Sequence, residues 1–247
     1  MEALPLRLLS GDEKMGTSKG YIAPSTPHWT QVKRGVSMYI GNPSNDGKRN
    51  AASKYAKAMN AEEYANSRVA HTLAAFASFA STSSTHGYAN ALREIGREDI
   101  LTMDSEDAIY ELTLHFANNG ETIDDAIALD CISETLVVLD VQRNEDLQNI
   151  EINTFIKEMV CQFAKLKFAQ LFDKQIRSKC PNIVQANQRI AEMQDYIYYT
   201  MELSLTDEIL ISINPHNLSN ETIVRDILRK GFELMEQYYG DLYENLD

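Results

Sequence analysis

Apolar residues recur at intervals of three and four through residues 146–178, which is the spacing of one face of an α-helix. The stripe includes Leu147, Ile150, Phe155, Met159, Phe163 and Leu166. Acidic Glu145 and Asp146 at the start and basic Arg177 at the end match the helix dipole, and Pro181 forbids continuation. The pattern therefore predicts a helix of about nine turns, which we expect to be the core helix of the fold.

Similar periodicity, small side chains and capping residues predict further helices. They cover residues 48–80 with a break near residue 60, then 88–95, 105–117, 122–139, 182–203 and 219–239. Thr122 followed by Asp125 resembles a capping box, and the Ser/Thr-rich residues 81–87 predict a loop. Only Val36–Ile40 and Glu208–Ile213 have a strand-like pattern, and two short, distant segments do not make a sheet. The fold class expected is all-α, a multi-helix bundle.

The first part of the chain differs in composition from the rest. Ten of the 17 glycines and prolines fall within residues 1–47, which predicts a flexible, extended leader and linker followed by a helical domain over residues 48–247. The net charge of −13 is also uneven, because residues 1–60 carry +5 and residues 61–247 carry −18. So acidic a chain disfavours a general nucleic-acid-coating role, which depends on many lysines and arginines.

The sequence contains no recognisable catalytic or metal-binding motif. Cys131 and Cys161 lie in apolar helical patterns and are expected in the core, and the five histidines lack zinc-site spacing. The glycine and lysine residues of 41–48 miss the spacing of a phosphate-binding loop by one residue. We therefore predict no metal, no cofactor and no catalytic set, and a non-enzymatic protein. Few cysteines and a longest apolar run of only twelve residues, 69–80, predict a cytoplasmic protein without a membrane span.

The single tryptophan, Trp29, lies in a segment rich in Gly, Pro and Ser, close to Pro24 and Pro27. Two interpretations stay open. An exposed indole on a proline-stiffened segment would serve as an anchor in a partner's pocket, since such anchors lose little entropy on binding. Alternatively, Trp29 docks on the helical body of its own chain.

The order of these features resembles the QatB family, the helical component of bacterial Qat antiphage defence systems. The resemblance rests on Met15-Gly16-Thr17-Ser18, on Pro24 and Pro27-His28-Trp29, on the linker through Gly47, on the alanine-rich helix of residues 49–81 and on the helical pair of residues 155–199. Family members have Pro-Pro-Trp where this chain has Pro27-His28-Trp29. They begin at the methionine that corresponds to Met15, so Met1 and Met15 are both candidate starts.

The resemblance implies a role in which a QueC-like enzyme of the QatC type acts on the N-terminal tail. Such enzymes use ATP to activate a 7-deazapurine carboxylate, and the tail would supply the acceptor amine at Gly16 after cleavage of the Met15–Gly16 bond. Further partners implied are a P-loop ATPase and a TatD-like nuclease. The tail residues expected to contact the partner are Thr17, Ser18, Lys19, Gly20, Tyr21, Pro24, Pro27 and Trp29.

An α-amine suits this chemistry because its pKa is near 8, against about 10.4 for lysine, so more of it is unprotonated at neutral pH. The alternative function is that of a helical regulatory or structural binder whose tail only tethers a partner. Under that alternative, Trp29 and the basic residues supply affinity and Gly16 is not modified.

Overall fold

The computed structural model describes residues 23–213 and 220–240, and within them the chain forms ten α-helices, four short 3-10 helices and no strand. The α-helices are α1 Pro27–Gly41, α2 Asn45–Ala61, α3 Arg68–His86, α4 Tyr88–Glu94, α5 Ser105–Phe116, α6 Ile123–Val138, α7 Ile152–Lys179, α8 Ile183–Ser204, α9 Asp207–Ile213 and α10 Asn220–Gly240. The 3-10 helices are η1 Tyr64–Asn66, η2 Glu98–Thr102, η3 Asn118–Gly120 and η4 Asn144–Asn149. The predicted all-α fold is confirmed.

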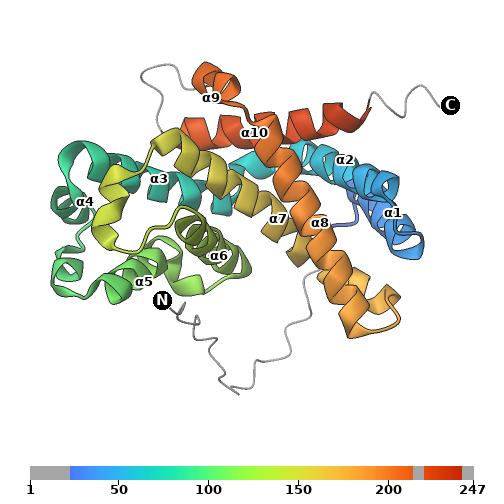
Figure 1. Ribbon diagram of the computed structural model, residues 1–247, viewed down its shortest axis with the longest axis horizontal. Coiled ribbons are helices and arrows are strands. Elements are labelled where there is room, and N and C mark those ends of the chain that lie inside the picture. Colours follow the sequence, from blue (N-terminus) through green and yellow to red (C-terminus); the bar gives the residue numbers. More distant parts are fainter. Residues whose placement is uncertain (1–22, 214–219, 241–247) are drawn as a thin grey trace.

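Helix α7 is the centre of the bundle, as its sequence pattern predicts. It contacts α8, α6, α1, α3 and α10, and its buried side chains point to every side rather than along one stripe. Figure 1 shows α7 running through the middle of the molecule, with α1 and α2 at one end and α4 and α5 at the other. A hydrogen bond of 2.9 Å from the Tyr55 hydroxyl to the Ala164 carbonyl also joins α2 to α7 within the core.

Several predicted boundaries are wrong for local reasons. Helix α7 begins at Ile152 rather than at residue 146, because the preceding residues form η4. Residues 81–86 continue α3 instead of forming a loop. The hydroxyl of Thr85 bonds the carbonyl of Ser81 one turn earlier, so its polar group is satisfied inside the helix. The helix ends at Gly87, whose φ of 89° suits glycine.

The two strand-like segments are also helical. Val36–Ile40 lies within α1, and Glu208–Ile213 lies within α9. The expectation of an irregular leader and linker through residue 47 is therefore wrong for α1, a helix of 15 residues. The part of that expectation that concerns residues 1–22 lies outside the described residues.

The capping box at the start of α6 is confirmed. The Thr122 hydroxyl accepts from the Asp125 amide at 3.1 Å, and the Asp125 carboxylate accepts from the Thr122 amide at 3.1 Å. Burial opposes ionisation of Asp125, but hydrogen bonds from Thr122 and Asn118 and the nearby charge of Arg68 outweigh it and lower its pKa. Arg68 of α3 lies 3.0 Å from the same carboxylate, so the cap also joins two helices.

Replacing Thr122 by alanine is expected to lower the free energy of unfolding by about 1 kcal/mol, because the Asp125 amide loses its acceptor. Urea denaturation followed by circular dichroism measures this change. Thr85→Ala is the matched control, since its exposed hydroxyl bonds only groups of its own helix, the carbonyls of Ser81 and Thr82 and the ring of His86. Equal midpoints for the two variants would contradict the prediction.

Candidate functional site at the base of the N-terminal segment

The described chain begins with residues that are fixed to the helical body. Ala23 is buried, and the Pro24 carbonyl accepts a hydrogen bond of 2.8 Å from Lys33 Nζ on α1. Two residues later, Thr26 Oγ1 donates to Glu62 Oε1 at 2.6 Å, in the turn after α2. Residues 23–26 are thus held by contacts from two elements, and we call residues 23–29 the base of the N-terminal segment.

Trp29 completes the base, and its side chain is entirely buried. The centroids of its rings lie 6.3 Å from that of Tyr55, 5.8 Å from Tyr64 and 6.1 Å from Phe172. The interpretation of Trp29 as an exposed anchor for a partner is therefore wrong. The indole docks on its own chain, because the aromatic residues of α2, η1 and α7 form a pocket for it.

The other predicted tail residues divide into two groups. Pro27 is exposed and occupies the first position of α1, where its fixed φ and missing N–H suit a helix start. Pro24 is partly buried, and its carbonyl faces Lys33. The predicted modification residues Met15 and Gly16 and the predicted contact residues Thr17, Ser18, Lys19, Gly20 and Tyr21 lie outside the described residues.

Helix α1 is itself fixed to the rest of the bundle by polar contacts. The amide of Gln175 on α7 donates to the Lys33 carbonyl at 2.8 Å and to Ser37 Oγ at 3.0 Å. At the other end of α1, the Tyr39 hydroxyl donates to the carboxylate of Glu192 on α8. Burial and this carboxylate raise the pKa of Tyr39 well above its usual range. The base therefore belongs to a rigid part of the molecule.

A family model supplies the identity that the geometry alone does not. The model described as Qat anti-phage system associated protein QatB matches residues 52–235. The chain belongs to the QatB family. No curated protein and no solved structure matches it.

The region matched to the QatB family begins inside α2 and ends inside α10. The base and α1 precede it, as do the motifs around Gly16 and Trp29. Nevertheless, α1 packs against QatB-family residues, since Tyr55 and Phe172 contact Trp29. The family match thus rests on residues 52–235, whereas the fixed base rests on contacts of residues that precede them.

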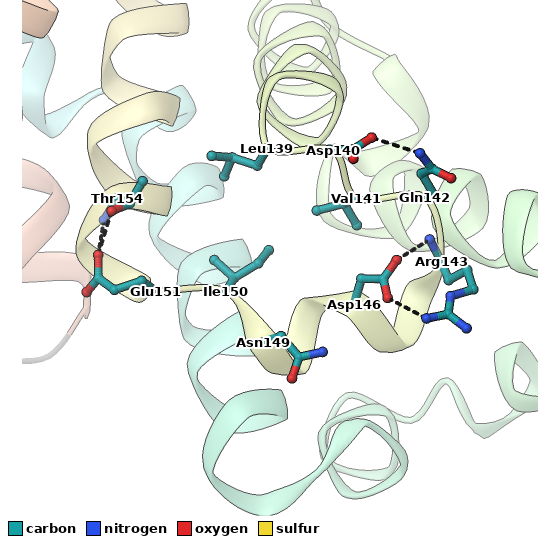
Figure 2. A pocket seen from close by; sticks show the side chains of 10 residues that line it. All are labelled: Leu139, Asp140, Val141, Gln142, Arg143, Asp146, Asn149, Ile150, Glu151 and Thr154. Atoms are coloured by element: carbon teal, nitrogen blue, oxygen red, sulfur yellow. Dashed lines mark hydrogen bonds and ion pairs between the residues drawn. The ribbon is translucent and has the colours of Figure 1, made fainter. Parts of the chain in front are cut away.

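A cavity of this QatB-family protein lies elsewhere, between the end of α6 and the start of α7. It has a volume of about 680 Å³ and is lined by residues between 139 and 154. Figure 2 shows polar side chains of its wall that bond one another: Gln142 with Asp140, Arg143 with Asp146, and Thr154 with Glu151. Arg143 and Asp146 neutralise each other, whereas Asp140 and Glu151 accept hydrogen bonds from neutral groups of the same cavity wall.

The cysteines of this QatB-family chain behave as the sequence predicts. Cys131 and Cys161 are fully buried, and burial raises the pKa of both thiols well above the usual range, which keeps them protonated. Within residues 23–213 and 220–240, no group of three or more His, Cys, Asp or Glu residues is placed to hold a metal ion. None of the described helices is long and apolar enough to cross a membrane.

Sequence reasoning missed the residues that form the base. Lys33, Glu62 and Tyr64 have no motif that marks them, because their roles depend on contacts between elements distant in sequence. One signal was present: Trp29, Val32, Val36 and Tyr39 recur at intervals of three, four and three, and all four are buried.

Proposed function

We propose that this chain is a non-enzymatic subunit of an antiphage defence system that presents its N-terminal tail to a QueC-like partner enzyme. The antiphage role itself follows from membership of the QatB family. In the proposal, the partner receives the tail after cleavage of the Met15–Gly16 bond and modifies the amine of Gly16. A P-loop ATPase and a TatD-like nuclease are the further partners proposed.

The observation that supports this proposal is the fixed base of the N-terminal segment. Lys33, Glu62 and Trp29 hold the chain from Ala23 onward, so the place at which the preceding residues join the body is fixed. Gly16 is seven residues ahead of Ala23. At about 3.6 Å per residue, its amine reaches at most about 25 Å from that place. A rigid body with a short tail is suited to presenting one amine to one enzyme.

The proposed modification takes place in two steps in the active site of the partner. First, a 7-deazapurine carboxylate and ATP give an acyl adenylate and pyrophosphate. Then the unprotonated Gly16 amine attacks the acyl carbon, an amide bond forms, AMP leaves and the amine loses a proton. Glycine has no Cβ, so its amine can enter a narrow site that other residues would block.

Intact-mass measurement of the chain tests the proposal. Coexpressed with the active partner, the chain is expected to begin at Gly16 and to carry one added 7-deazapurine amide. Expressed alone, it is expected to lack the added mass. Fragmentation of the first peptide then assigns the modified atom.

Two controls make the measurement decisive. Purified chain beginning at Gly16 is incubated with partner and carboxylate, with and without ATP, and only the complete mixture is expected to give the product. An unmodified Met15–Gly16 bond in cells that contain the active partner would refute the proposal. It would favour the alternative in which the tail only tethers a partner.

A further inference from the structure

The two helices next to the base carry an excess of positive charge on an otherwise acidic protein. Residues 23–57 contain six cations and a single acid, Asp46. The cations are Lys33, Arg34, Lys48, Arg49, Lys54 and Lys57. By contrast, residues 88–116, which include α4 and α5, contain seven acids and two arginines. Figure 1 places these two regions at opposite ends of the molecule.

Close packing of α1 on α2 brings two of the cations together. A Cβ at Gly35 would lie 3.3 Å from Ala51 Cα and 3.3 Å from Lys54 Cδ, so glycine permits this approach. Burial lowers the pKa of Lys54, and the nearby charge of Arg34 lowers it further. Within the described part of the chain, neither Arg34 nor Lys54 forms an ion pair with an acid.

An exposed apolar side chain lies one turn after Arg34 on α1. Met38 follows Arg34 by one helical turn, which places the two on the same side of α1, and Met38 is 63% exposed. We call Arg34, Met38 and Lys54 the α1–α2 basic face. Arginine and methionine are enriched in protein interfaces, whereas a nucleic-acid surface would need a broader run of cations.

The short tail limits where an enzyme acting on Gly16 can sit. If the partner's reacting atoms lie inside a cleft, part of the reach of about 25 Å is used within the cleft. We therefore expect the rim of the cleft to contact the body within the reach that remains from Ala23. Lys33 joins this place to the basic face, because its side chain bonds the Pro24 carbonyl and its neighbour in sequence is Arg34.

We infer that the α1–α2 basic face is the docking surface for the enzyme that modifies Gly16, and that this enzyme presents an acidic surface with an apolar recess beside its active-site entrance. The inference rests on the proposed function for the identity of the enzyme. Beyond the proposed function, the inference specifies which surface of the body the enzyme contacts and which charge the enzyme's matching surface carries.

Charge reversal tests the inference. The full chain and its Arg34→Glu/Lys54→Glu variant are compared for binding to the purified QueC-like partner by surface plasmon resonance, at low and at physiological salt. Binding of the variant is expected to be about tenfold weaker or more, with a smaller dependence on salt, because complementary charges are replaced by repelling ones. Arg34→Gln/Lys54→Gln is expected to be intermediate, and circular dichroism checks that each variant is folded.

The matched control is Arg93→Glu/Arg143→Glu, which makes the same change in net charge. Arg93 and Arg143 are exposed and belong to α4 and to the start of η4, away from the basic face. This control is expected to bind the partner as the unchanged chain does. Equal weakening by both double variants would show a general charge effect and overturn the inference.

The remaining outcomes separate this inference from the proposed function. If the chain binds and is modified but the Arg34/Lys54 variant binds equally well, the docking surface is wrong and the proposed function stands. If the chain binds without a mass change and charge reversal abolishes binding, modification is wrong and the docking surface stands. Absence of binding by the unchanged chain overturns both. A last outcome is that the charge reversal weakens binding of a short DNA or RNA duplex and leaves binding of the enzyme unchanged. In that case the face is a nucleic-acid site and the inference is wrong.

Discussion

Replacing Trp29 by alanine is expected to destabilise the protein by about 3–5 kcal/mol, the range for loss of a fully buried large aromatic side chain. The indole contacts rings from α2, η1 and α7, so its removal leaves a cavity among three elements. The loss is a large fraction of the stability of a typical domain. Urea denaturation measures the change, and loss of binding to any partner would follow from unfolding rather than from a missing contact.

Two further variants define the cause. Trp29→Phe keeps most of the packing and removes an indole Nε1 that has no acceptor among the described residues, so it is expected to cost much less than alanine. His28→Ala changes the exposed neighbour and is expected to alter stability by less than about 0.5 kcal/mol. A loss below about 1 kcal/mol for Trp29→Ala would mean that the indole is not part of the core.

Replacing Gly16 by proline is expected to abolish both modification of the chain and protection of bacteria from phage. The pyrrolidine ring surrounds the amine with carbon atoms and makes it too bulky for a site that admits glycine. The contacts that fix the base are made by Pro24, Thr26 and Trp29 and do not involve Gly16. Plating efficiency of phage on cells that carry the complete system measures protection, and intact mass measures modification.

Ile22→Pro is the matched control for this experiment, since it also introduces a proline into the tail, lies outside the residues expected to contact the partner and leaves the Gly16 amine free. It is expected to retain the modification. Full protection by the Gly16→Pro variant would contradict the proposed function and favour a tail that only tethers a partner. Under that alternative both proline variants would behave alike.

The helical body was predictable from sequence because its signals are local. The apolar residues that recur every three or four positions in α7, the capping box of Thr122 and Asp125 and the proline after α7 each act within one element. Helix α1 was missed for the opposite reason. Its glycines and prolines indicate a linker, whereas its stability comes from burial of Trp29, Val32, Val36 and Tyr39 against distant helices.

The residues of the candidate site also divide into those with a local sequence signal and those defined by contacts between distant elements. Gly16 and Trp29 could be singled out by type and by their surroundings, but sequence alone left the exposure of Trp29 open. Lys33 and Glu62 fix the base through bonds to a backbone carbonyl and to a threonine hydroxyl. Such bonds have no compositional signature, so only the three-dimensional arrangement identifies them.

The position of the base decides how truncated forms of this protein can be interpreted. Removing residues 1–22 would take away Gly16 and spare the contacts of Pro24, Thr26 and Trp29. Removing residues 1–30 would also remove the Trp29 indole from the core. A loss of activity would then have two causes, the absence of the Gly16 amine and the destabilised fold. Deletion mapping that crosses residue 23 therefore reports on stability, and only shorter deletions report on the tail.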